Sequence, residues 1–223
     1  MTAVPRVGLL VGPQFADLAD RSEQQGAFAS LGGRTLVPVA VRQAGESARD
    51  AASRVRAVCA RGVSILLVVD VAIPVRPDWA ANHERYALIT DHLNLTGDNP
   101  LVGPNAVDWG PRFPDLTDAW DPDLRAVLHG AARECQVEPR EGVIAGGGAL
   151  SSTAAEQRML RALGADMASD GFVWDAITGR HAGRRMAGLG VMVPDDAHGR
   201  EADAFRGLLS SFAAALEEAA VSP

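Results

Sequence analysis

Lysine is absent from this chain of 223 residues, and all 21 basic residues are arginine. This absence excludes Schiff-base chemistry and a lysine general base, because both need a side-chain amine that can lose its proton. Cysteine is scarce as well: Cys59 and Cys135 lie in helix-like segments, without the spacing that is typical of metal sites. We therefore predict two reduced thiols, no metal ion and no other cofactor.

Long apolar runs and clusters of positive charge are missing too. No run reaches the roughly 18 apolar residues of a transmembrane helix. Pro and Gly interrupt the apolar stretch at the start of the chain too early for a signal peptide. The formal net charge of −7 argues against nucleic acid or an anionic membrane as a partner. The composition, with 47% hydrophobic residues, predicts a cytoplasmic protein with a single domain over residues 1–223.

Apolar runs alternate with helical stripes along the chain, which predicts an α/β fold. The run at 63–69 is continuously apolar, which indicates a central strand covered on both faces. Pro38 indicates that its own strand lies at an edge or contains a bulge. Strands are expected at 6–12, 34–41, 63–69, 86–90, 142–145, 165–169 and 186–193, and helices at 47–60, 122–136, 154–163, 173–181 and 201–220.

The segment 91–113 reads DHLNLTGDNPLVGPNAVDWGPRF. Its density of Gly, Pro, Asn and Asp predicts that no helix or central strand continues through it, and an ordinary surface loop fits its composition. Its order of residues is more specific. DHLNLTGDNPLVGPN followed by RFPDLTDAWDPDLR resembles the middle of the trimeric purine nucleoside phosphorylase family, whose members read close to DHINL, NPLxGPN and RFPxMxxAYDxxLR.

The resemblance implies a central mixed β-sheet, partly barrel-like, flanked by helices and assembled as a homotrimer that binds a small-molecule substrate. It covers the chain well from residue 91 onward, and the first 90 residues only by the order of elements. It places Trp109 where the family sends an aromatic residue across the trimer interface to cover the neighbouring sugar. His198 stands where a family histidine meets the 5′-hydroxyl of the sugar.

The family's phosphate-binding residues are replaced in this chain. Gly12-Pro13 stands in place of a Gly-Ser turn, Asp70 in place of an asparagine, and Gly171 in place of a serine. The family's Arg-x-His segment is not recognisable between Val41 and Arg54, where Arg42 is the only candidate for its arginine. A carboxylate at position 70 would repel an incoming phosphate, so the resemblance predicts that phosphate is not held in the family's manner.

The residues that would hold the purine are replaced as well. Ser152 falls at the position of the family's purine-binding glutamate, and Pro194 at that of an asparagine whose amide stabilises the departing base. Proline has no side-chain amide to take that role. Phe172, Trp174 and Trp109 would make the pocket more aromatic than that of the family.

Two carboxylates could supply acid–base chemistry in such a pocket. Asp170 at a strand end and Asp175 at a helix start lie five residues apart, and paired carboxylates act as acid and base when their environments separate their pKa values. Asp175 is also explained as a first-turn carboxylate favoured by the helix dipole, and Asp170 as a loop residue. Trp109 could serve interface packing alone, and His198 could be a surface residue.

These replacements favour a phosphorylase-like protein with a rebuilt, phosphate-independent pocket. It would act on a small molecule of specialised metabolism by rearrangement, cyclisation, elimination or hydrolysis. Two alternatives stay open: a divergent purine nucleoside phosphorylase that cleaves a nucleoside with phosphate, and a non-catalytic trimeric binding or scaffold protein. The fold alone does not distinguish them.

Overall fold

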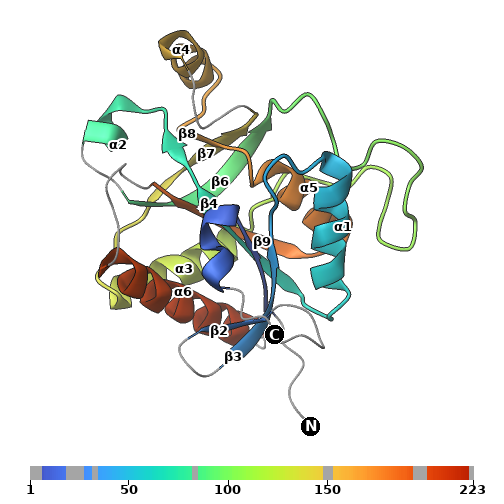
Figure 1. The fold of residues 1–223 in the computed structure, drawn as a ribbon, viewed down its shortest axis with the longest axis horizontal. Coiled ribbons are helices and arrows are strands. Elements are labelled where there is room, and N and C mark those ends of the chain that lie inside the picture. The colour runs from blue at the N-terminus through green and yellow to red at the C-terminus, as the bar shows by residue number, and fades with distance from the viewer. Residues whose placement is uncertain are drawn as a thin grey trace.

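A computed structural model describes residues 7–18, 28–31, 35–81, 85–147, 153–192 and 200–220 (Figure 1). The strands are β1 (Val7–Val11), β2 (Phe28–Leu31), β3 (Thr35–Val41), β4 (Ile65–Val71), β5 (Ile73–Pro74), β6 (Tyr86–Asn94), β7 (Arg140–Gly146), β8 (Met167–Ser169) and β9 (Arg185–Val191). The helices are η1 (Pro13–Leu18, 3-10), α1 (Ala48–Cys59), α2 (Pro77–Ala81), α3 (Pro122–Glu134), α4 (Ala154–Ala162), α5 (Val173–His181) and α6 (Arg200–Ala219).

The nine strands of the described residues form one curled, mixed sheet in the order β2-β3-β1-β4-β9-β6-β7-β8-β5. The strands β3, β1, β4 and β9 are parallel neighbours, and β6 pairs antiparallel with β9. Helices α1 and α5 pack together on one side of the sheet, and α3 and α6 on the other (Figure 1). The expected mixed sheet flanked by helices is confirmed.

Strand β4 lies between β1 and β9 and is parallel to both. Its side chains alternate between two core clusters, because successive residues of a strand point to opposite faces. Leu67 packs with Leu9 on the side of α3 and α6, and Leu66 packs with Leu10 on the side of α1 and α5. The expectation that this apolar run is a doubly covered central strand is confirmed.

Strand β6 is longer than the sequence indicates. It lies between β9 and β7 and continues to Asn94, so the predicted strand end at residue 90 is wrong. From residue 95 to residue 113 the chain forms no helix or strand, as expected. The residues 91–94 contain no Gly or Pro, and they pair in parallel with β7 after a shift in register between Ile89 and Asp91. The first glycine of the segment, Gly97, lies beyond the strand end.

Strand β3 is not an edge strand of the sheet, although it contains Pro38. The short strand β2, which the sequence does not reveal, pairs antiparallel with it and takes the edge position. Pro38 lies opposite Phe28, at one end of this pairing. A proline is tolerated there because the ladder of hydrogen bonds ends at that point.

Side-chain caps mark the beginnings of α1, α3 and α4. Ser47 accepts a hydrogen bond from the backbone N–H of Asp50 at the start of α1, and Asp121 caps α3 in the same way. Thr153 and Glu156 form a reciprocal capping box at the start of α4. These local bonds satisfy backbone N–H groups that the first turn of a helix leaves without partners.

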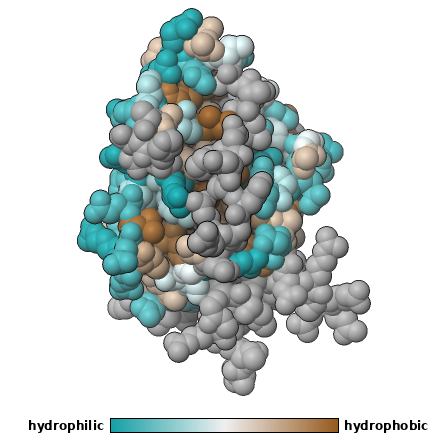
Figure 2. Space-filling view, turned by 60° about the vertical axis from the view of Figure 1, so that its left-hand side comes forward, coloured by the Kyte–Doolittle hydropathy of each residue, from teal (hydrophilic) through white to brown (hydrophobic). Residues whose placement is uncertain are grey.

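Most of the coloured surface in Figure 2 is hydrophilic, and apolar surface gathers in a few small areas of this face. Within the part of the chain that the structure describes, no helix is both long enough and apolar enough to cross a membrane.

Candidate functional site

The carboxyl ends of the parallel strands β3, β1 and β4 lie side by side, where open α/β sheets usually bind their ligands. The backbone N–H of Arg42, the residue after β3, donates to the carbonyl of Val11 at 2.8 Å. The N–H of Gly12, the residue after β1, donates to the carbonyl of Val69 at 2.9 Å. We call the group formed by Gly12, Arg42, Asp70 and Gly171 the strand-end cradle.

The carboxylate of Asp70 occupies the centre of this cradle. Arg42 donates to its Oδ2 from Nε at 3.0 Å and from Nη2 at 2.8 Å, and the backbone N–H of Val71 donates to Oδ1 at 2.8 Å. The side chain of Asp70 is 3% exposed and that of Arg42 is 13% exposed. Burial raises the pKa of the Asp70 carboxyl, and Arg42 opposes that shift.

Glycine is required on two sides of this carboxylate. A Cβ atom on Gly12 would lie 1.9 Å from Oδ1 of Asp70, and a Cβ atom on Gly171 would lie 1.7 Å from Oδ2. Any side chain at either position would therefore displace the carboxylate or the backbone. Gly171 precedes α5, so the cradle joins three strand ends to the beginning of a helix.

A second buried ion group lies between α1 and α5, and we call it the helix clamp. Arg54 of α1 donates to both carboxylate oxygens of Asp175, at 2.6 and 3.3 Å, and to both oxygens of Glu46, at 2.9 to 3.2 Å. Burial disfavours the charge of Arg54, but Asp175 and Glu46 raise its pKa above the ordinary value. Burial raises the pKa of Asp175, against the effect of Arg54.

The two carboxylates expected to form an acid–base pair lie in different environments. Asp170 is exposed in the turn between β8 and α5, whereas Asp175 is 2% exposed and bound by Arg54. The structure thus gives Asp175 a counter-ion that joins two helices. Its catalytic role, like that of Asp170, stays a prediction.

The three aromatic residues that were expected to line the pocket differ in how deeply they are buried. Phe172 is fully buried, and its ring packs edge-on against Trp120 with centroids 6.0 Å apart. Trp174 is half-buried, and its Nε1 donates to Oγ1 of Thr96 at 3.1 Å. Trp109 is half-buried against the core cluster under α1 and α5. Ser152 and His198, the expected contacts to the base and the sugar, lie outside the described residues, and so does Pro194, which was expected to lack the family's contact to the base.

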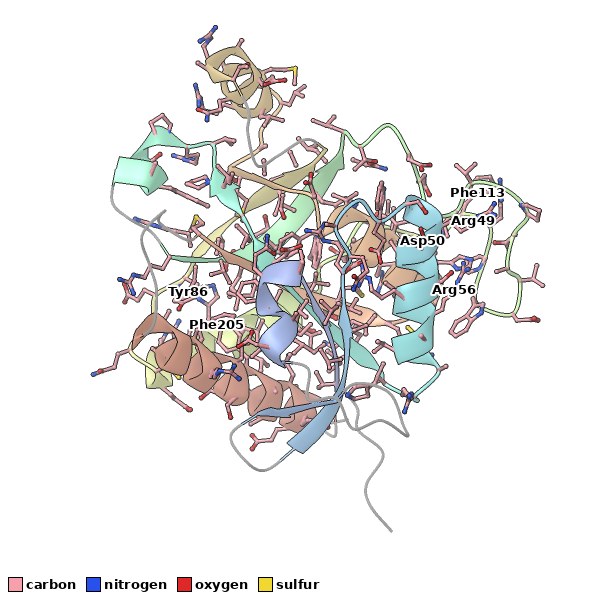
Figure 3. All side chains as sticks on the ribbon, in the orientation of Figure 1. Arg49, Asp50, Arg56, Tyr86, Phe113 and Phe205 are labelled. Atoms are coloured by element: carbon pink, nitrogen blue, oxygen red, sulfur yellow. The ribbon has the colours of Figure 1, made fainter. Side chains whose placement is uncertain are left out.

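A cavity of about 290 Å³ separates α1 from the segment 98–106. Arg49 and Arg56 of α1 line it, and Figure 3 shows both side chains on the side of the loop that carries Phe113. Asn105 ties this loop to the core, because its Oδ1 lies 3.2 Å from Nε2 of His181. Among the described side chains, no group of three or more His, Cys, Asp and Glu could hold a metal ion.

Comparison with known proteins places this fold in a family. The family model of the Phosphorylase superfamily matches residues 19–222. The chain belongs to this superfamily. It is similar to purine nucleoside phosphorylase 1 of Bacillus subtilis, with 31% identity over 211 residues that cover 83% of this chain and 77% of the relative. The namesake of Geobacillus stearothermophilus is 32% identical, with coverage of 83% and 76%.

Solved structures agree with these relatives. A Schistosoma purine nucleoside phosphorylase in complex with hypoxanthine superposes with a TM-score of 0.75 at 26% identity. The match covers 98% of this chain and 92% of that chain. The segment 91–113 resembles the nucleoside phosphorylases, and the family membership that this resemblance implied is therefore confirmed. The structural similarity extends over 98% of this chain.

The expectation of a rebuilt, phosphate-independent pocket is contradicted, because the relatives that match over three quarters of their own length are named purine nucleoside phosphorylases. That expectation counted single replacements in the phosphate-binding turns. It gave too little weight to Arg42 as a possible phosphate ligand. The fold brings this arginine to the carboxyl ends of the parallel strands. A signal for it was available: Arg42 directly follows a predicted strand, where ligand-binding side chains of α/β sheets are common.

Proposed function

We propose that this protein is a cytoplasmic purine nucleoside phosphorylase, which cleaves the bond between purine and ribose with inorganic phosphate. The observation that carries this proposal is its similarity to the Bacillus subtilis enzyme, at 31% identity over 83% of this chain. The similarity to a phosphorylase solved with hypoxanthine supports a purine as the base.

The strand-end cradle is the proposed phosphate site. Arg42 would hold the phosphate with its planar guanidinium, which matches phosphate oxygens in two parallel hydrogen bonds. Gly12 and Gly171 leave room for an anion because neither has a side chain. A phosphate oxygen would then bond to C1′ of the ribose while the bond from C1′ to the purine nitrogen breaks. The base leaves with the electron pair and takes up a proton.

Positive charge develops on the sugar in the transition state of this reaction, so a phosphate held against the ribose stabilises it. Ser152, His198 and Trp109 remain the proposed contacts to base and sugar. Asp170 is the proposed acid–base group on an exposed turn, and Asp175 is the buried alternative. Replacing each by Asn separates the two roles, since a true acid–base group changes the pH dependence of turnover.

We also propose that three copies of the chain assemble as a trimer. The segment that resembles the family's interface loop exposes Val102 by 74%, Val107 by 75% and Phe113 by 86%. Large apolar side chains in this number suit an interface. Light scattering coupled to gel filtration should give a trimer, and Phe113→Ser should weaken it; a monomeric wild type would refute the assembly.

The proposed activity is tested with inosine, guanosine and methylthioadenosine, each incubated with and without phosphate. We expect free base to appear only when phosphate is present, together with one sugar phosphate for each base. Equal release of base without phosphate would show a hydrolase and would contradict the proposal. No release from any of the three nucleosides would also contradict it.

A further inference from the structure

The carboxylate of Asp70 is bound as an anionic ligand would be bound. It accepts two hydrogen bonds from the guanidinium of Arg42 and one from the backbone N–H of Val71. It fits between the backbones of Gly12 and Gly171, where no Cβ atom has room. The strand-end cradle is thus an anion site with its anion supplied by the protein itself.

We propose that Asp70 competes with phosphate for Arg42, so that phosphate binds only when Asp70 releases the arginine and takes up a proton. This inference rests on the proposed function for the identity of the anion. It adds a residue that sets the phosphate affinity and makes that affinity depend on pH.

The charges around the cradle explain why a proton must accompany the phosphate. Arg42 faces Asp70 from the end of β3, and the helix clamp contributes Arg54 from α1, Asp175 from α5 and Glu46 from the turn before α1. Two guanidinium groups therefore face three carboxylates, apart from the exposed Asp170 in the turn before α5. A phosphate dianion would increase this excess of negative charge, which is unfavourable in a buried site.

Protonation of Asp70 removes one of these negative charges. Burial already raises the pKa of its carboxyl, while Arg42 holds it down. When phosphate takes Arg42, that opposing effect is lost, and the pKa of Asp70 rises further. Proton binding and phosphate binding then favour each other, because linked equilibria are reciprocal. The affinity for a dianion should therefore rise as the pH falls.

Titration calorimetry on the full chain tests this with sulfate, a tetrahedral dianion that keeps its charge between about pH 5 and about pH 8, so that any proton uptake belongs to the protein. Asp70→Asn keeps the shape of the side chain but not its charge. We expect it to bind sulfate and phosphate at least about tenfold more tightly than the wild type. Asp78→Asn on α2 is the matched control, because it removes the same charge from an exposed pair with Arg76, and its affinity should equal that of the wild type.

The pH dependence gives a second measurement, which needs no variant. One linked proton strengthens sulfate binding to the wild type by up to about tenfold for each pH unit of acidification, and Asp70→Asn should lose this slope. Equal sulfate affinity in the wild type and a folded Asp70→Asn protein would overturn the proposal. A pH-independent affinity of the wild type, or no sulfate binding to folded Asp70→Asn, would overturn it too.

Failure of this inference and failure of the proposed function give different results. Tighter anion binding by Asp70→Asn without base release from any nucleoside would refute the phosphorylase activity and keep the competition at Arg42. Phosphate-dependent base release with unchanged phosphate affinity in Asp70→Asn would keep the activity and refute the competition.

Discussion

The strand-end cradle and the helix clamp each hold a buried carboxylate with an arginine, yet they differ in what surrounds the pair. In the clamp, Arg54 is shared by Glu46 and Asp175, and its bonds join α1 to α5. In the cradle, Arg42 holds the single carboxylate of Asp70, which fills the space that Gly12 and Gly171 leave at the strand ends. An arginine with two buried carboxylates is committed to the fold, whereas an arginine with one can exchange it for a ligand.

Removing the cation of the clamp should give the largest effect on stability. Arg54→Met leaves Glu46 and Asp175 close together and buried without a counter-ion, so we expect the free energy of unfolding to fall by about 3–5 kcal/mol. Urea denaturation followed by circular dichroism measures this. Arg76→Met, which breaks exposed pairs, should cost at most about 1 kcal/mol; a similar loss in both variants would mean that the clamp does not hold the helices.

Removing the cation of the cradle should instead affect catalysis. Arg42→Gln should lower kcat/KM for phosphate in phosphorolysis by about 100-fold or more, since the cation that orients the phosphate and stabilises its charge is lost. Steady-state kinetics with inosine and varied phosphate measure it. Arg125→Gln, in a surface pair with Glu141, should leave the rate unchanged. Full activity of Arg42→Gln would place the phosphate elsewhere.

The smallest expected effect is the one that pH has on the free energy of unfolding through the buried carboxyl of Asp70. The pKa of Asp70 is raised in the folded protein, so the folded chain keeps this proton to a higher pH than the unfolded chain does. In buffer without phosphate, the contribution of Asp70 to the free energy of unfolding should therefore decrease as the pH rises from about 4, by up to about 1.4 kcal/mol per pH unit for one proton.

Asp175, whose pKa is raised as well, contributes to the same slope. The difference between the wild type and Asp70→Asn isolates the part that belongs to the cradle. Unfolding curves of both proteins at several pH values measure this part. Identical slopes would show that Asp70 holds no extra proton in the folded state.

Much of the fold could be predicted from the sequence, because it depends on local patterns. The continuous apolar run of β4 indicated burial on both faces, and the helices expected at 47–60 and 122–136 contain α1 and α3. The strand β2 and the full extent of β6 could not be predicted in this way. Their formation depends on partners in β3 and β7, and pairing between strands is not encoded in the residues of one strand alone.

Some residues of the candidate site could also be predicted from the sequence, and others could not. Asp70 and Gly171 could be marked as positions of interest from the resemblance to the family, and both lie in the cradle. The clamp could not be foreseen, because Arg54 and Asp175 are 121 residues apart in the chain. Asp175 in the first turn of a helix was explained equally well by the helix dipole.

The sequence by itself determined the family, through the segment 91–113, and the positions of most helices and strands. Only the tertiary structure decided what each charged side chain does. A buried carboxylate becomes a counter-ion, a ligand or an acid according to which donors lie within about 3 Å of it and how much water remains. In this protein the fold brings Arg42 to Asp70 at the proposed phosphate site, and it brings Arg54 to Asp175 between two helices.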